Sequence, residues 1–252
     1  MVQLTELVNY TNSLLAVDRF SDYCPNGLQV EGRAEVRRLV CGVTACQALV
    51  DAAVAAKADA LLVHHGYFWK GEAAAITGIK MRRIKALLDA EISLLAWHLP
   101  LDAHPQLGNN AQLGQRLGLL TTGLFPVQDK AAVGLQGQLA EPQSADSFAA
   151  RIESVLGRQP LYFAPNARLI KTIAWCSGGA QSYIEDAADA GVDAYLSGEV
   201  SEQTFHLARE RDIHFFAVGH HASERYGVQA LAKHLTQKFD FKSEFIDILN
   251  PV

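Results

Sequence analysis

A short apolar run that ends in two adjacent histidines constrains this chain more than any other feature. The run 59–63 shows no apolar–polar alternation and follows a helical pattern, so we expect a parallel strand covered on both faces. His64, His65 and Gly66 come directly after it. An open α/β sheet binds ligands beyond the carboxyl ends of its strands, and Gly66 permits a bend that would bring both imidazoles to one site. The pair is therefore a candidate for metal binding, and two ordinary polar residues leaving a strand are the alternative.

Strand and helix patterns alternate along most of the chain, which predicts an α/β fold. A length of 252 residues can bury a substantial core, as one large domain or as two smaller ones. We expect two related α/β halves, 1–120 and 170–252, which together form one metal-binding unit. Between them, turn signals, an alternating strand at 133–139 and a helix near 144–156 predict a small α+β insertion over 121–169. A lid and an assembly surface would both fit this insertion.

An internal repeat supports the two related halves. A shift of 134 residues places Asp59-Ala60 on Asp193-Ala194, and the helix patterns before them also correspond. A different offset places Leu94-Leu95-Ala96 on Phe215-Phe216-Ala217. Because alanine-rich helices match easily by chance, the sequence alone suggests this repeat without establishing it.

Residues of ligand type also follow two later strands. The next predicted strand is followed by His98 and Asp102, and the strand before the last helix is followed by His220 and Glu224. Glu224 is predicted to lie on the inward face of the first turn of that helix. A carboxylate buried there is costly without a cation nearby.

The candidate metal ligands are His64, His65, Asp102, His220 and Glu224. Three imidazoles and two carboxylates exceed the needs of one tetrahedral ion, and the set contains no thiolate. We therefore expect two divalent ions per chain, from among Zn, Fe, Mn, Co and Ni. A bridging carboxylate would hold two such ions about 3.5–4 Å apart.

Charge and composition limit the binding partners and the cellular location that we expect for this chain. The net charge of −5 gives no global basic surface, so a nucleic-acid partner is allowed but not favoured. The beginning of the sequence has no basic and apolar signal pattern, and no apolar run reaches the roughly 20 residues that span a bilayer. We expect a cytoplasmic protein with no membrane partner. The four cysteines form no C-x-x-C pair and are interpreted as reduced structural thiols.

Several segments carry a family resemblance when they are taken together. They are Asp22-Tyr23-x-Pro25-Asn26-Gly27-Leu28-Gln29-Val30-Glu31-Gly32, Val63-His64-His65-Gly66, Trp97-His98-Leu99-Pro100-Leu101-Asp102, Gly198-Glu199-Val200-Ser201-Glu202 and Gly219-His220-His221-Ala222-x-Glu224. Over nearly the whole chain, the sequence closely resembles the YbgI-type, Nif-three-like family. Members of this family are often labelled GTP cyclohydrolase I type 2 homologues.

The resemblance implies a specific use of the candidate ligands. His65 and Asp102 would bind one metal ion, His64 and His220 would bind the other, and Glu224 would bridge them. It also implies a pair of related α/β domains and a toroidal homohexamer whose metal sites open to an internal cavity. Some members of the family are reported to open the imidazole ring of GTP.

Two classes of function remain open at this point. The first is a metal-dependent hydrolase or cyclohydrolase that acts on a nucleotide or related heterocycle through a metal-bound hydroxide. His98 and Glu199 are then the candidate catalytic residues for proton transfer, with a supporting structural role as the alternative for each. The second class is a non-enzymatic, ring-shaped metal-binding assembly or a scaffold for a protein or nucleic-acid partner. An enzyme must keep a coordination position open, whereas a structural site can be closed.

Overall fold

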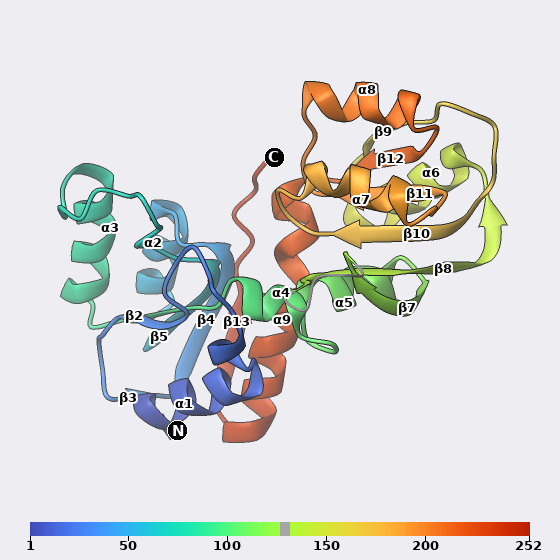
Figure 1. Cartoon of the computed structure of the whole chain (residues 1–252). Coiled ribbons are helices and arrows are strands. Elements are labelled where there is room, and N and C mark those ends of the chain that lie inside the picture. Colours follow the sequence, from blue (N-terminus) through green and yellow to red (C-terminus); the bar gives the residue numbers. More distant parts are fainter. Residues whose placement is uncertain (127–131) are drawn as a thin grey trace. The chain divides into compact units, whose positions relative to one another are not determined.

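The structure is a computed structural model that describes residues 1–126 and 132–252. The chain forms two compact units (Figure 1). Unit 1 contains residues 1–101 and 227–249, and unit 2 contains residues 102–226 and 250–252. The α/β fold class predicted from the sequence is confirmed.

Unit 1 is built on a five-stranded sheet with the strand order β13-β4-β5-β6-β2. Neighbouring strands from β13 to β6 are parallel, and β2 pairs with β6 in the antiparallel direction. A separate antiparallel pair joins β1 to β3. The elements of this unit are β1 (Val2–Gln3), α1 (Leu4–Leu14), the 3-10 helix η1 (Val17–Arg19), β2 (Gly27–Val30), β3 (Glu35–Val36), β4 (Arg38–Thr44), α2 (Gln47–Ala55), β5 (Ala60–His65), α3 (Gly78–Asp89), β6 (Ser93–Ala96) and β13 (Lys242–Phe245).

Unit 2 is built on a six-stranded sheet with the order β7-β8-β10-β11-β12-β9. The central strands β10, β11 and β12 are parallel, and the outer strands pair in the antiparallel direction. Its elements are α5 (Asn109–Arg116), β7 (Leu119–Phe125), β8 (Gly134–Gln143), α6 (Ala145–Leu156), β9 (Leu161–Phe163), β10 (Ile170–Cys176), the 3-10 helix η2 (Gln181–Tyr183), α7 (Ile184–Asp189), β11 (Ala194–Ser197), α8 (Glu202–Glu210) and β12 (His214–Ala217). The chain passes between the units within α4 (Leu99–Ala103) and α9 (His220–Phe239).

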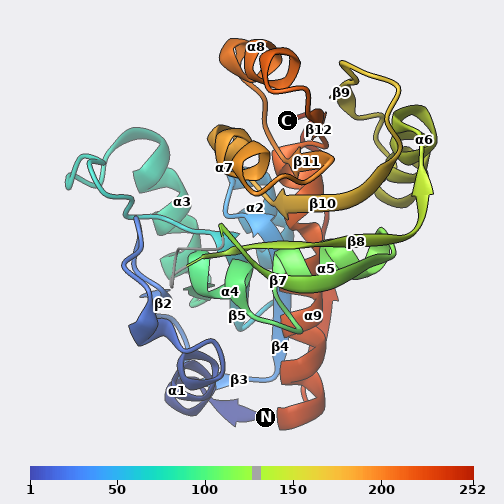
Figure 2. The ribbon, with the colours of Figure 1, turned by 45° about the vertical axis from the view of Figure 1, so that its right-hand side comes forward.

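Alternating side chains of β10 place two apolar cores on the two faces of the unit 2 sheet. Ile173 and Trp175 belong to a core that also contains residues of α5 and α6. Ala174 and Cys176 belong to the other core, with residues of α7 and α8. Figure 2 shows α7 and α8 on the same side of β10 and β11. The central strand β10 is therefore covered on both faces, as its apolar run 173–176 requires.

The two units repeat one local arrangement of strands. Leu39 pairs with Ala60 in unit 1 and Ile173 pairs with Ala194 in unit 2, and the matching residues of both pairs are 134 apart. The sequence β4-α2-β5-α3-β6 therefore corresponds to β10-α7-β11-α8-β12. The predicted relation between the two halves is confirmed by strand register, which chance similarity of alanine-rich helices does not explain.

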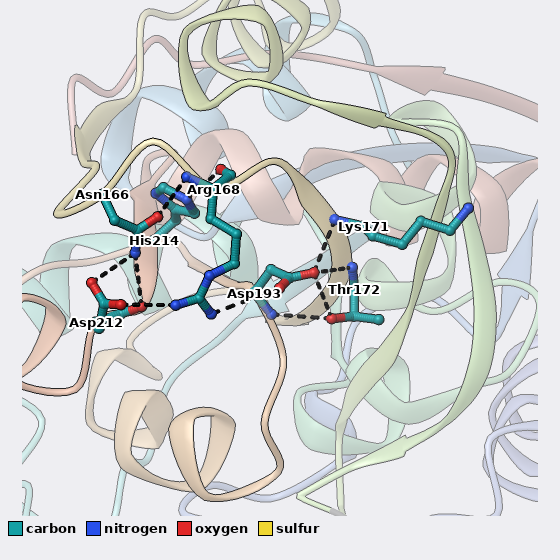
Figure 3. A network of polar contacts seen from close by, with 7 residues as sticks. All are labelled: Asn166, Arg168, Lys171, Thr172, Asp193, Asp212 and His214. Carbon is teal, nitrogen blue, oxygen red and sulfur yellow. Dashed lines mark hydrogen bonds and ion pairs between the residues drawn. The ribbon is translucent and has the colours of Figure 1, made fainter.

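An aspartate before the second strand of each repeat makes the same hydrogen bonds. Asp59 Oδ2 accepts from the backbone N–H groups of Arg37 and Arg38, each at 2.9 Å. In unit 2, Asp193 Oδ2 accepts from the backbone N–H groups of Lys171 at 3.0 Å and Thr172 at 2.9 Å (Figure 3). These contacts connect the first strand of each repeat to the residue that precedes the second.

The predicted domain boundaries differ from the two units. The stretch expected as an α+β insertion, 121–169, contains most of β7 with β8, α6 and β9, and these elements complete the unit 2 sheet. Within that stretch, 127–131 lie outside the described residues. The first unit also includes the later part of α9 and β13, because β13 pairs with β4. Sequence patterns show where elements lie but do not show which sheet a distant strand joins.

Among the helices of the described residues, none combines the length and the apolar character required to cross a membrane.

Candidate metal-ligand groups in each unit

Unit 1 brings three imidazoles together at the carboxyl ends of β5 and β6. These strands are parallel neighbours, so His64 and His65 at the end of β5 lie close to His98, which follows β6. The three side chains each offer a nitrogen within 4.8 Å of the others, a grouping that could hold a metal ion. The His64 ring centroid lies 4.5 Å from that of His65 and 5.1 Å from that of His98. The sequence predicted the histidine pair as ligands and His98 as a catalytic residue, and the structure places all three in one cluster.

The Nδ1 atoms of His64 and His65 each contact an oxygen of unit 1. His64 Nδ1 lies 3.0 Å from the backbone oxygen of Trp97, which can only accept, so Nδ1 carries the proton. His65 Nδ1 lies 3.1 Å from Thr44 Oγ1. A histidine that ligates a metal through one nitrogen is usually held by a hydrogen bond at the other. These contacts therefore leave Nε2 as the atom of each ring that could bind a metal ion.

His98 is held by the loop that precedes β2. Its Nδ1 lies 2.7 Å from Asp22 Oδ1, and its backbone N–H donates to Asn26 Oδ1 at 2.7 Å. Asn26 in turn donates to Asp22 Oδ2 at 2.8 Å. Burial of Asp22 raises its pKa, but the contacts with His98 and Asn26 outweigh that effect and lower the pKa to about 2. Asp22 therefore stays ionised at neutral pH and holds the His98 ring through Nδ1.

Unit 2 places His220, Glu224 and Glu199 in direct contact. His220 begins α9, so Glu224 lies one turn further along the same helix. His220 Nε2 lies 3.1 Å from Glu224 Oε2, and His220 Nδ1 lies 2.7 Å from Glu199 Oε1. Burial lowers the pKa of His220, but the hydrogen bonds and charges of Glu224 and Glu199 raise it to about 9. The imidazole thus lies between two carboxylates, one of which, Glu224, is buried.

Asp102 is a second buried carboxylate of unit 2. Asn109 Nδ2 donates to Asp102 Oδ1 at 2.9 Å, and Ser177 Oγ donates to the same oxygen at 3.2 Å. Burial raises the pKa of Cys176 well above its usual value, and the charges of Asp102 and Glu224 raise it further. The two carboxylates therefore both act on one fully enclosed thiol. A cation is the usual partner of such buried negative charge.

Gly178 lets the backbone pass close to the Glu224 carboxylate. Its φ is +67°, and a Cβ atom there would overlap a carboxylate oxygen of Glu224 and lie 3.3 Å from His220 Nε2. The Gly178 N–H donates to Ser223 Oγ at 3.1 Å. Any residue larger than glycine would displace the carboxylate or the imidazole.

Several residues that hold the candidate ligands were not assigned this role from the sequence. Asp22 and Asn26 lie in a motif that carried the family resemblance, and this was the available signal. Thr44 contacts His65, and a sequence pattern gives no sign of this pairing, because the two residues lie on neighbouring strands. Ser177 follows a strand end directly, which was a usable signal.

The donor atoms fit a divalent ion of borderline or hard character. The groups contain imidazole nitrogens and carboxylate oxygens, and among their described residues Cys24 alone carries a thiol, in the group with Asp22 and His98. Burial raises the pKa of Cys24 to about 12, which disfavours a thiolate. Imidazole and carboxylate ligands suit Zn, Fe, Mn, Co and Ni.

The fold and these groups define an α/β protein with buried histidine, aspartate and glutamate side chains that could hold a metal ion. The chain belongs to the Duf34/NIF3 (NGG1p interacting factor 3) family, whose sequence model matches residues 2–251. The resemblance stated from the motifs is therefore confirmed.

Similar proteins support the same family. A Pseudomonas aeruginosa protein named GTP cyclohydrolase 1 type 2 homolog is 55% identical over 250 residues, which are 99% of each chain. A solved structure described as protein ybgI, of unknown function, has a TM-score of 0.95 and 50% identity, with 100% of both chains covered. A crystal structure of a Thermus thermophilus protein has a TM-score of 0.91 and 32% identity, again with 100% of both chains covered.

Proposed function

We propose that this chain is a metal-dependent hydrolase that acts on a nucleotide or a related heterocycle. The observation that carries the proposal is the support of the imidazoles: in His64, His65 and His220, Nδ1 contacts a protein oxygen, so Nε2 would be the nitrogen that binds a metal ion. A purely structural histidine needs no such common arrangement. The name GTP cyclohydrolase 1 type 2 homolog, given to similar proteins, supports the substrate class.

We propose that two divalent ions bind per chain, with the native metal among Zn, Fe, Mn, Co and Ni. His65 and Asp102 would bind one ion, His64 and His220 would bind the other, and Glu224 would bridge them. Three imidazoles and two carboxylates exceed the needs of one tetrahedral ion, and this number of donors supports two ions. These five ligands do not complete two five- or six-coordinate shells, which leaves positions for water and substrate.

The ions would supply Lewis-acid activation of water and of the electrophilic atom. His98 would carry a proton between substrate and solvent through Nε2, because the ionised Asp22 holds its Nδ1 and orients the ring. Glu199 would position His220 through the 2.7 Å contact with Nδ1 rather than react itself. The two candidate catalytic residues thus differ in role.

Metal analysis of a Glu224→Gln variant tests the bridging carboxylate. The amide has nearly the shape of the carboxylate but is a much weaker ligand, so we expect the loss of at least one metal equivalent per chain with an unchanged circular dichroism spectrum. Glu202→Gln is the matched control, because Glu202 is exposed and its removal changes the net charge equally. Full metal content in the Glu224→Gln variant would contradict the bridge.

Chelation tests the hydrolase itself. Wild-type protein that is stripped with EDTA should lose turnover of GTP and of other nucleotides, and addition of the native metal should restore it. Turnover that survives removal of the metal would refute the mechanism. Two metals per chain with no turnover on a broad panel would favour a metal-binding scaffold instead.

The assembly and the location stay predictions. We expect a toroidal homohexamer, which light scattering would measure as a mass of six 27.4 kDa chains. We also expect a cytoplasmic protein, which fractionation of cells would test.

A further inference from the structure

Two aromatic side chains, Tyr23 and Trp69, lie beside the imidazole cluster of unit 1. The Trp69 ring centroid is 5.0 Å from that of His98 and 6.0 Å from that of His65. The Tyr23 ring centroid is 6.4 Å from that of His98. We call Tyr23 and Trp69 the aromatic pair. No role was assigned to either residue in the site described above.

Hydrogen bonds connect the two loops that carry the aromatic pair. The Lys70 N–H donates to the backbone oxygen of Tyr23 at 2.6 Å. Gln29 also joins the loops, because its Oε1 accepts from the Tyr67 N–H at 2.7 Å and its Nε2 donates to the Pro25 oxygen at 2.8 Å. These contacts fix the loops before any ligand binds.

Trp69 is itself held in a defined orientation. Its indole Nε1–H donates to the Gly66 oxygen at 3.2 Å, directly after the histidine pair. Its backbone N–H donates to Glu72 Oε2 at 3.2 Å, and Lys80 Nζ lies 3.3 Å from the same carboxylate oxygen. A ring fixed in this way loses little conformational entropy when a ligand stacks on it.

The exposure of the aromatic pair differs from that of the two other tryptophans. Tyr23 is 61% exposed, and Trp69 is only partly buried. Trp97 and Trp175, the two other tryptophans, are each 0% exposed and belong to the apolar interior. Packing in the apolar interior accounts for the presence of Trp97 and Trp175. Tyr23 is mostly exposed, so its side chain contributes little to the stability of the fold.

We propose that the aromatic pair binds the planar ring of an aromatic heterocycle, such as a nucleobase, next to His98. The inference rests on the proposed function, since it names the part of the substrate that this side of the site recognises. Aromatic side chains stack on any base because every base has a π face. Fixed rings beside His98 would hold such a heterocycle within reach of its imidazole.

Equilibrium dialysis against guanosine 5′-monophosphate and ribose 5-phosphate tests the proposal. The two probes share a phosphate and a ribose, and only the first has a base. Wild-type protein should bind the nucleotide more tightly, and Trp69→Leu or Tyr23→Leu should weaken that binding about tenfold, as the loss of one stacked ring predicts. Trp69→Phe should keep most of the affinity. None of these variants should change the affinity for ribose 5-phosphate.

Tryptophan fluorescence gives an independent readout. Because Trp97 and Trp175 are buried, the nucleotide should quench the emission of Trp69 selectively and saturably. The Trp69→Phe variant should lose this quenching while it still binds in dialysis. Equal affinity of wild type for both probes, no binding of the nucleotide, or a Trp69→Leu variant within twofold of wild type would each overturn the proposal.

The same samples separate this inference from the proposed function. Elemental analysis reports the metal content, and dialysis reports recognition of the base. Two metals per chain together with no preference for the nucleotide would refute the aromatic pair alone. Preference for the nucleotide in protein that never binds metal would refute the hydrolase and retain the aromatic pair.

Discussion

Replacement of Glu199 by alanine should weaken binding of Zn²⁺ about tenfold. Loss of the carboxylate that holds a ligating histidine costs about 10- to 100-fold in metal affinity, or ~1.4–2.8 kcal/mol. The contact from Glu199 Oε1 to His220 Nδ1 is short, at 2.7 Å. The side chain of Glu199 is 37% exposed and that of His220 is 29% exposed, so water screens the interaction and can replace part of it. We therefore expect the lower end of the range.

Competition with a chromophoric chelator would measure this change. Glu199→Gln keeps an oxygen that accepts from Nδ1–H but loses the charge, so its affinity should fall between those of wild type and Glu199→Ala. Glu202→Ala removes an exposed carboxylate three positions away and serves as the control for net charge. An affinity of Glu199→Ala within twofold of wild type, or an equal loss in Glu202→Ala, would refute the positioning role.

Two further predictions concern stability. Asp193→Ala should lower the free energy of unfolding by about 2–4 kcal/mol in urea titrations, because a charged acceptor of three hydrogen bonds is lost. Asp212→Ala, which removes an exposed ion pair with Arg168 and an exposed hydrogen bond from Asn166, should cost at most ~1 kcal/mol. Burial raises the pKa of Asp193, but its hydrogen bonds outweigh this effect and lower the pKa. The contribution of Asp193 to the free energy of unfolding should therefore be complete above about pH 4, the pKa of the carboxyl in the unfolded chain, and should disappear as the pH falls through the lower pKa of the folded protein. Gly66→Ala should cost about 1–3 kcal/mol, since the added Cβ would lie 2.7 Å from Ala96 Cβ and overlap Gln29, and Gln29→Ala in the same chain should recover part of that loss. Equal stability of the Asp193→Ala and Asp212→Ala variants, or additive losses in the double variant, would contradict these explanations.

The parallel strands and their ends could be predicted because the sequence signal is local. The apolar run before His64 predicted a strand at 59–63, and a strand does lie there, although β5 (Ala60–His65) also includes the two histidines that were expected to follow it. The internal shift of 134 residues also anticipated the matching registers of β4 with β5 and of β10 with β11. The common position of Asp59 and Asp193 gives the physical reason, because each holds the strand before it.

The composition of each sheet could not be predicted in the same way. β13 (Lys242–Phe245) pairs with β4 although about 200 residues of chain separate them, and no local pattern encodes that choice. The strands β7 and β8 carry turn signals that resemble those of an independent insertion, yet they extend the unit 2 sheet through β10. Partner choice depends on which edge remains open once the central strands have paired, which is a property of the whole unit.

The supporting contacts of the ligands form the least predictable part of the site, and they also distinguish a functional histidine from an ordinary one. Asp22 and His98 are 76 positions apart, and Glu199 and His220 are 21 apart, so neither spacing matches a helix or strand repeat. Each contact nevertheless orients an imidazole. A histidine at a strand end is common. When a carboxylate also holds its Nδ1, the arrangement indicates that Nε2 binds a metal ion or transfers a proton. The proposed function therefore depends on the residues that hold the candidate ligands as much as on the candidate ligands, and the variants of Glu199 test that conclusion most directly.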